Sequence, residues 1–362
     1  MTQLTPRPCA QPWQDAGDVA PPLPRQDPIT QLPIVILQPH SRCNCRCVMC
    51  DIWQITTKQE IAPEAVERWL PEWRTLGVRR VVLSGGEALL HSRLWDMCRA
   101  LRDADIGITI LSTGILLRRH AENIVRYCDD VVVSLDGPRE IHDGIRRIPG
   151  AFDKLSDGIR AVRAADASGS VHISGRSVVQ LANYRQLRAT VAAAHETGLD
   201  RISFLAVDVS SDAFNRPDGW QPAQIARTAL AVEDLVVLMA ELDALEQDNR
   251  ADFESGFIAE SPLKLRRRLY QYFSALLGSG DFHPIECNAP WVSTLIETDG
   301  TVRPCFFQPP LGNILDSGSL DAVLNSESAI AWRSGLDTHR NEICRKCVCS
   351  LSLRANDSSY PA

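Results

Sequence analysis

The sequence predicts an α/β protein built as a partial (β/α)6 barrel of the TIM type, followed by helical linkers and a small cysteine-rich domain. From Ile34 onward, short apolar runs alternate with longer segments of helical period, which is typical of βα units around a parallel sheet. Nine of the twelve cysteines fall in two stretches, Cys43 to Cys50 and Cys287 to Cys349. The second stretch marks the small C-terminal domain.

Six apolar runs are predicted to be the barrel strands, and the amphipathic segments between them are predicted helices. The strands are Ile34–Leu37, Arg80–Leu83, Ile106–Leu111, Val131–Leu135, Val171–Ser174 and Ile202–Ala206. The helices are Pro63–Leu76, Ser92–Ala104, Leu116–Tyr127, Ala151–Ala164 and Tyr184–Glu196. Right-handed crossovers would place the working site at the carboxyl ends of these strands.

The remaining segments set the expected domain boundaries. Residues 1–32 are rich in Pro, Gln and Asp and are expected to be a disordered tail, followed by the barrel at residues 33–215. Helices at Ala223–Gln247 and Pro262–Leu277 form a linker over residues 216–282, and the basic run from Lys264 to Arg268 is expected to be a solvated helix face. The last domain, residues 283–362, should contain a hairpin around Asp299-Gly300 and a helix at Leu320–Arg333.

Composition narrows the class of partner. The formal net charge of -7 gives no positive field of the kind that binding to a phosphate backbone needs, so we expect no nucleic-acid partner. No apolar stretch reaches the roughly 20 residues that span a bilayer, and we expect a cytoplasmic protein with no membrane contact. Twelve cysteines in such a chain favour metal or catalytic roles over disulfides.

The first cysteine stretch follows the first predicted strand directly. Cys43, Cys47 and Cys50 have the spacing C-x3-C-x2-C, so one tight loop can bring them together. Three thiolates suit an iron–sulfur cluster whose fourth iron stays open to a ligand. Taken alone, the cysteines also allow a zinc site made from Cys47-x2-Cys50 and Cys344-x2-Cys347.

Polar motifs follow three further strands. Gly85, Gly86 and Glu87 come after the second strand, where the glycines permit a close backbone approach and the carboxylate could bind an ammonium group. Ser112-Thr113-Gly114 follows the third strand and Ser134-Leu135-Asp136-Gly137 the fourth. His142, Asp143 and Arg146 come next, and Asn183 lies near the start of a later helix.

The cysteine triad, the Gly-Gly-Glu motif and the Ser-x-Asp-Gly motif on consecutive strands together resemble the radical S-adenosylmethionine (radical SAM) superfamily. The resemblance implies that Cys43, Cys47 and Cys50 hold a [4Fe-4S] cluster whose open iron binds S-adenosylmethionine. It also implies cofactor contacts from Gly85, Gly86, Glu87, Thr113, Ser134, Asp136, Arg146 and Asn183. Two positions depart from the family pattern, with Met49 where an aromatic residue is frequent and Ala88 where proline is common.

The second cysteine stretch resembles the Twitch domain, a shortened relative of the SPASM domain of many radical SAM enzymes. Cys287, Gly300 and Cys305 have the C-x9-15-G-x4-C spacing, and Cys344-x2-Cys347 follows. The resemblance implies one auxiliary [4Fe-4S] cluster bound by Cys287, Cys305, Cys344 and Cys347. Cys45 does not fit the family spacing. Cys349 is expected to be a bystander, and the alternatives are a further cluster ligand or a hydrogen donor to a substrate radical.

The resemblance implies reductive cleavage of S-adenosylmethionine to a 5'-deoxyadenosyl radical, with the electron supplied by an external donor such as flavodoxin or ferredoxin. Our first hypothesis is oxidation or epimerisation of a small polar natural-product intermediate. It follows from the single auxiliary cluster and from the roughly 32 residues before the first strand, too few for a peptide-recognition domain. The alternatives are a maturase acting on a ribosomally made precursor peptide and a non-enzymatic iron–sulfur or zinc-binding module. No catalytic acid, base or hydrogen donor can be named from the sequence.

Overall fold

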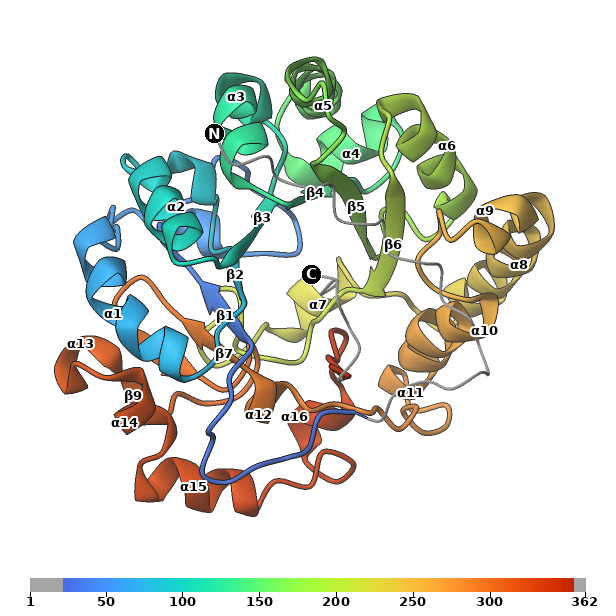
Figure 1. The fold of residues 1–362 in the computed structure, drawn as a ribbon. Helices are drawn as coiled ribbons and strands as arrows, with labels where there is room; N and C mark the ends of the chain where they lie inside the picture. Colours follow the sequence, from blue (N-terminus) through green and yellow to red (C-terminus); the bar gives the residue numbers. More distant parts are fainter. Residues whose placement is uncertain (1–21, 355–362) are drawn as a thin grey trace.

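The computed structural model describes residues 22–354, which form one nine-stranded sheet with helices around it (Figure 1). The strands lie in the order β6-β5-β4-β3-β2-β1-β7-β8-β9. The first six are parallel and are β1 Ile34–Leu37, β2 Arg80–Leu83, β3 Gly107–Ser112, β4 Asp130–Ser134, β5 His172–Val179 and β6 Arg201–Ala206. The predicted partial barrel is therefore confirmed.

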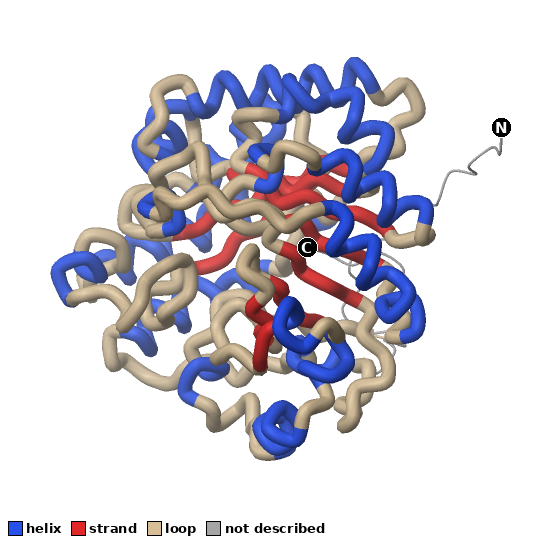
Figure 2. The backbone as a smooth tube through the Cα atoms, turned by 90° about the vertical axis from the view of Figure 1, so that its left-hand side faces the viewer, coloured by secondary structure: helices blue, strands red, loops and turns tan. Residues whose placement is uncertain are grey.

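Helices cover the outer side of the curved sheet, with the strands inside (Figures 1 and 2). They are α1 Pro63–Thr75, α2 Leu94–Asp103, α3 Leu117–Tyr127, α4 Arg139–Arg146, α5 Ala151–Ala165 and α6 Leu187–Thr197. Helix α4 was not predicted, because Gly144 interrupts a short and strongly polar segment. Helix α6 begins three residues after its predicted start, because Asn183 and its neighbours form a turn first.

The linker contains more breaks than the sequence predicted. The expected helix over residues 223–247 is two helices, α7 Pro222–Ala226 and α8 Asp234–Asp248, and α9 Arg250–Glu254 follows. The next segment is helical from α10 Pro262–Leu265 through a π-helix, Arg266–Gln271, to α11 Tyr272–Leu276. No helix within residues 22–354 is long and apolar enough to cross a membrane.

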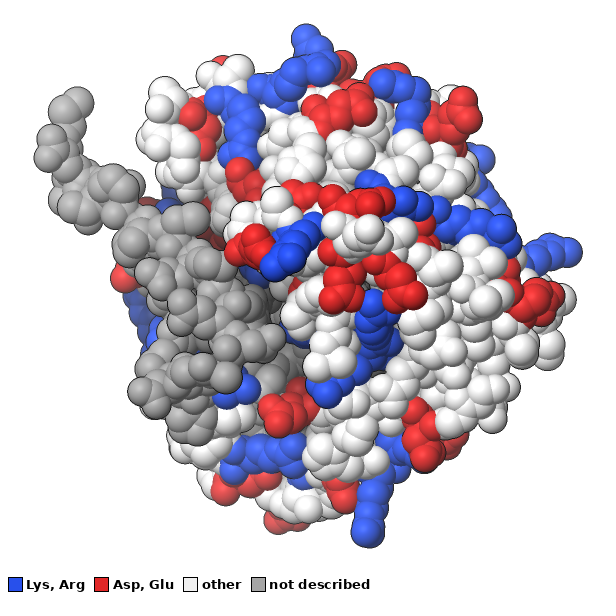
Figure 3. Space-filling view, turned by 90° about the vertical axis from the view of Figure 1, so that its right-hand side faces the viewer, with Lys and Arg blue, Asp and Glu red and all other residues white. Residues whose placement is uncertain are grey.

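The basic run on this linker is paired with acidic side chains. Arg266 forms ion pairs with Asp243 and Glu246 of α8, and Arg268 pairs with Glu260. The face of the molecule seen in Figure 3 accordingly mixes positive and negative side chains. Arg266 and Arg268 of this run thus contribute ion pairs between segments of the linker.

The C-terminal hairpin extends the barrel sheet. Strand β7, Ser293–Ile296, pairs in parallel with β1 and antiparallel with β8, Thr301–Arg303, and β9 is Gly312–Asn313. Gly300 sits in the turn with φ of 85°, a left-handed conformation that favours glycine. Short helices complete this part: α12 Ala289–Val292, α13 Ile314–Ser317, α14 Leu320–Leu324, α15 Glu327–Ser334 and α16 Glu342–Arg345. The predicted helix Leu320–Arg333 is split in two because Ser326 caps α15.

The N-terminal boundary differs from the expected tail at residues 1–32. Residues 22–32 pack on the C-terminal part of the chain, with Ile29 and Leu32 fully buried. The backbone N–H of Leu23 donates to the Leu353 carbonyl, and the Asn325 side chain both donates to and accepts from the Ile29 backbone. Residues 1–21 and 355–362 lie outside the described residues.

The ion pair between Asp27 and Arg333 fixes this segment. The Arg333 side chain is fully buried, and its Nε lies 2.5 Å from Asp27 Oδ1. We expect Asp27→Ala to destabilise the protein by about 3 kcal/mol, because it leaves a buried guanidinium without a counter-charge. Denaturant unfolding measures the loss of stability.

Asp96→Ala is the control for this variant. It removes an exposed carboxylate that pairs with Arg93 and Arg99, and it should cost about 1 kcal/mol or less. Equal losses in the two variants would contradict the burial argument.

Candidate iron–sulfur and cofactor site

The cysteine loop lies at the carboxyl end of β1, and the polar motifs follow β2, β3 and β4 at the same edge, since these strands are parallel. Helix α4 supports the loop through its last turn. The backbone N–H of Arg46 donates to the Arg146 carbonyl at 3.1 Å, and that of Val48 to the Ile145 carbonyl at 3.0 Å. The last turn of α4, the helix that follows β4, thus holds the cysteine loop in place.

Cys43, Cys47 and Cys50 lie near one another at this edge. Burial raises the pKa of the Cys43 and Cys50 thiols to about 12, and the charges of the neighbouring cysteines add to the effect. A hydrogen bond from Cys45, helped by the charge on Arg146, lowers the pKa of Cys47 to about 6 despite its burial. Three thiolates here therefore need added positive charge, which iron would supply.

Gly85 and Gly86 bring the backbone after β2 against the cysteine loop. A Cβ atom on Gly86 would lie 2.3 Å from the Arg42 carbonyl oxygen and 2.9 Å from the Cys43 nitrogen. The Glu87 N–H donates to the same Arg42 carbonyl at 3.0 Å. The glycines were predicted to allow a ligand to approach, but the neighbour that the structure shows is the cysteine loop itself.

The Glu87 carboxylate forms hydrogen bonds with the end of the neighbouring strand β3. Its side chain is fully buried and accepts hydrogen bonds from the hydroxyl groups of Ser112 and Thr113 and from the backbone N–H groups of Leu89 and Thr113. Burial raises the pKa of this carboxyl group. The carboxylate therefore ties the Gly-Gly-Glu loop to the end of β3. Its expected contact with an ammonium group of the cofactor stays a prediction.

The Asn183 side chain forms hydrogen bonds with backbone groups. Its amide nitrogen donates to the carbonyls of Asp136 and Val178, and its oxygen accepts from the Gln180 N–H. These three contacts hold the loop after β5 against the loop after β4. The cofactor contact expected of Asn183 stays a prediction.

Asp136 and Arg146 form a buried pair beside the cysteines. Arg146 Nη2 lies 2.6 Å from Asp136 Oδ2, and Arg146 Nη1 donates to the Cys47 sulfur at 3.4 Å. Asp136 Oδ1 accepts from the Val178 N–H. Ser134 ends β4 half-buried, opposite Arg176 of β5. His142 is fully buried, and burial together with the Arg146 charge lowers its pKa to about 4, so it is neutral at pH 7.

Several buried polar atoms at this edge have no hydrogen-bond partner among the described residues. They include Asn44 Nδ2, His142 Nε2, Arg146 Nε and Gln180 Oε1. A buried donor without a partner costs about 1–3 kcal/mol, so such a group is expected to meet a ligand. The donors Asn44 Nδ2 and Arg146 Nε, beside the cysteine triad, would suit the carboxylate and hydroxyl groups of S-adenosylmethionine. The Asn44 side chain also contacts the Thr113 side chain at 3.0 Å.

The second set of cysteines gathers around Cys287. Cys305 interacts electrostatically with Cys287 and Cys344, and burial raises its pKa to about 12. Burial, followed by the charge of Cys349, raises the pKa of Cys347. The Cys349 N–H donates to the Cys347 sulfur at 3.4 Å, while the Cys349 side chain is exposed. Cys98 and Cys128 are both buried and interact electrostatically with each other, and Cys9 lies outside the described residues.

Within residues 22–354, no three His, Cys, Asp or Glu side chains lie close enough together to hold a single metal ion. The zinc arrangement of Cys47 and Cys50 with Cys344 and Cys347 is therefore not formed. A [4Fe-4S] cluster spaces its cysteines more widely, because each thiolate binds a different iron atom.

The segment from Asp208 to Trp220 was not identified from the sequence as part of a functional site. In the structure this segment contacts residues that follow both groups of cysteines. The Asp51 N–H donates to the Phe214 carbonyl, and the Trp220 indole donates to the Asp51 carboxylate at 2.6 Å. The Phe214 ring packs on Phe306 and Phe307, which follow Cys305. Phe214 and Asn215 both have φ of 62°, a left-handed conformation that costs non-glycine residues energy and is frequent at functional sites.

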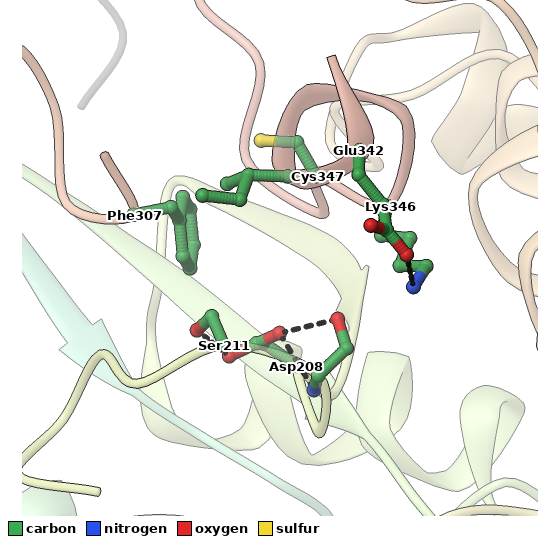
Figure 4. A pocket seen from close by; sticks show the side chains of 8 residues that line it. Asp208, Ser211, Phe307, Glu342, Lys346 and Cys347 are labelled. Carbon is green, nitrogen blue, oxygen red and sulfur yellow. Dashed lines mark hydrogen bonds and ion pairs between the residues drawn. The ribbon is translucent and has the colours of Figure 1, made fainter. Parts of the chain in front are cut away.

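A cavity of about 210 Å³ lies between this segment and the C-terminal cysteines. Figure 4 shows Asp208 and Ser211 on one side, and Phe307, Glu342, Lys346 and Cys347 on the other. Asp208 is neutralised by the fully buried Arg216, and Glu342 by Lys346. The charges in the cavity wall are therefore balanced, and Phe307 and Ile343 add apolar surface to it.

Comparison with known proteins agrees with this geometry. Residues 37–191 match the radical SAM superfamily model, and residues 287–348 match the SPASM iron–sulfur cluster-binding domain. The AdoMet-dependent heme synthase of Methanosarcina barkeri is 27% identical over 161 residues, covering 43% of this chain and 45% of that protein. The chain thus spans less than half the length of the first curated relatives it matches.

Two solved structures share the fold. Streptococcus suis SuiB bound to S-adenosylmethionine has a TM-score of 0.63 at 16% identity, covering 89% of this chain and 73% of SuiB. Native anSMEcpe with bound AdoMet and the Cp18Cys peptide has a TM-score of 0.61 at 19% identity, covering 88% of this chain and 89% of that one. The chain carries a radical SAM domain at residues 37–191 and a SPASM-type iron–sulfur domain at residues 287–348, with S-adenosylmethionine and [4Fe-4S] clusters as the cofactors of these domains.

Proposed function

We propose that the chain uses a 5'-deoxyadenosyl radical to abstract hydrogen from a small polar natural-product intermediate, leading to its oxidation or epimerisation. In this proposal Cys43, Cys47 and Cys50 hold the cluster that S-adenosylmethionine joins, and Cys287, Cys305, Cys344 and Cys347 hold one auxiliary cluster. When bound, the cofactor supplies the radical. The protein binds the substrate, orients it and excludes water.

The observation that carries the substrate class is the cavity beside Cys347. Its volume of about 210 Å³ lies below the 300–1,000 Å³ usual for pockets that hold drug-sized ligands. Ser210, Ser211 and Lys346 line the cavity with polar groups whose hydrogens are directed to Asp208 and Glu342. The paired charges give no net attraction for a highly charged ligand. A small polyhydroxylated compound suits these contacts.

A second candidate is a peptide maturase that receives a single side chain in the same cavity. The observation that favours it is the shared fold of anSMEcpe in complex with a peptide, over 88% of this chain. An acidic one-electron donor of the flavodoxin or ferredoxin type is the proposed reductant in either case.

Transfer of deuterium from substrate to 5'-deoxyadenosine tests this proposal. The reconstituted full chain is incubated with S-adenosylmethionine, a reductant, and carbon-deuterated amino sugars or cyclitols, with short peptides and a tetrapyrrole in parallel. We expect deuterium in 5'-deoxyadenosine from the small polyols. Transfer from peptides alone would establish the second candidate instead.

A cavity-filling variant tests whether the substrate binds in the cavity beside Cys347. Ser210→Trp should lower substrate-dependent turnover by about tenfold or more, while uncoupled formation of 5'-deoxyadenosine stays near the wild-type rate. Ala322→Trp, on the exposed side of α14 and outside the cavity, is the matched control. Full turnover in Ser210→Trp would contradict the assignment of the cavity.

A further inference from the structure

Arg146 makes a contact that its expected cofactor role does not explain. The residue lies in the last turn of α4 with its side chain 7% exposed. One end of its guanidinium donates to the Cys47 sulfur at 3.4 Å, and the other end lies 2.6 Å from the Asp136 carboxylate. The contact joins positions 99 residues apart in the chain.

The pair is built into the fold. Asp136 is fully buried, and the Val178 N–H donates to its other oxygen. The backbone of α4 is fixed to the cysteine loop by the two hydrogen bonds that the Arg146 and Ile145 carbonyls accept. Among the described residues, Arg146 is the one charged side chain with a hydrogen bond to a thiol of the triad. Its charge therefore acts on that thiol at a fixed distance.

Charge at this position changes the energy of the reduced cluster. Reduction adds one negative charge to iron and sulfur, and a cation within hydrogen-bond distance of a ligand sulfur stabilises that charge. Burial of both partners limits screening by water and salt. Asp136 opposes the effect, because its carboxylate offsets part of the Arg146 charge.

We infer that Arg146 is a positioning residue that raises the reduction potential of the cluster at Cys43, Cys47 and Cys50, and that Asp136 limits this rise. The inference rests on the proposed cluster assignment. It concerns the ease of reduction and not the identity of the substrate.

The test is a redox titration of the reconstituted full chain, followed by electron paramagnetic resonance, without S-adenosylmethionine. We expect Arg146→Gln to lower the reduction equilibrium constant by about tenfold, which is about 59 mV for a one-electron couple. Asp136→Asn should shift it in the opposite direction, because the Arg146 charge is then uncompensated. Arg146→Lys keeps the charge and should stay close to the wild type.

Arg147→Gln is the matched control, because this neighbouring residue is exposed and its side chain makes no hydrogen bond with a cysteine among the described residues. It should leave the potential unchanged. If Arg146→Gln loses its iron, the reduction potentials of Asp136→Asn and Arg146→Lys still test the inference. An unchanged potential in Asp136→Asn, or shifts of the same sign in both neutral variants, would overturn the inference. If wild-type protein gains no signal from the triad while the auxiliary cluster forms, the cluster assignment itself fails.

Discussion

Cys47→Ala is expected to abolish cleavage of S-adenosylmethionine and to lower the iron content from about eight to about four atoms per chain. The alanine removes one of three thiolates in a loop that has no spare ligand in the family spacing. The auxiliary cluster, held by a distant set of cysteines, should remain. Iron analysis and an assay for 5'-deoxyadenosine after anaerobic reconstitution measure both effects.

Cys45→Ala is the matched control for this loss. Cys45 lies in the same loop and is as buried as Cys47, but its thiol donates a hydrogen bond to Cys47 and is not assigned to iron. The variant should keep about eight irons and should still form 5'-deoxyadenosine. If Cys45→Ala lost the cluster and Cys47→Ala kept it, the ligand assignment would be wrong.

Gly86→Ala is expected to prevent assembly of the same cluster without touching a ligand. The new methyl group would lie 2.5 Å from the Arg42 carbonyl carbon and 2.9 Å from the Cys43 nitrogen, so the cysteine loop must move. Forcing a methyl group into packed backbone costs about 1–3 kcal/mol. We expect the iron content to fall to about four atoms per chain and the free energy of unfolding to fall by that amount.

Gly144→Ala provides the comparison for this change. A Cβ at Gly144 would have no neighbour within 4 Å, and the residue lies inside α4. Alanine there should stabilise the protein by up to about 1 kcal/mol and leave the iron content unchanged. Wild-type iron in Gly86→Ala would show that the loop does not depend on this close approach.

The barrel could be predicted because each strand is a short apolar run of its own. Parallel strands buried on both faces leave such runs in the sequence, as Arg80–Leu83 and Ile34–Leu37 illustrate. The cysteine triad was expected from its spacing together with the motifs on the following strands, because the spacing alone also allowed a zinc site. The pairing of β7 with β1 could not, because nothing in either strand specifies a partner more than 250 residues away.

The hydrogen bonds of Glu87 and Asn183 show a second limit of prediction from the sequence. Sequence motifs locate these residues at strand ends, but the direction of each side chain depends on which donors the neighbouring strand presents. Ser112 and Thr113 draw the Glu87 carboxylate inward, and two backbone carbonyls occupy the Asn183 amide. The segment around Phe214 escaped prediction for a related reason, since its contacts with Asp51 and Phe307 join distant residues without any motif.

The fate of S-adenosylmethionine with the wild-type protein tests directly whether the chain cleaves this cofactor reductively. The full chain is reconstituted with iron and sulfide without oxygen, then incubated with S-adenosylmethionine and dithionite. We expect methionine and 5'-deoxyadenosine in equal amounts. Intact S-adenosylmethionine in the presence of a protein that carries about eight irons and shows reduced clusters would contradict this expectation.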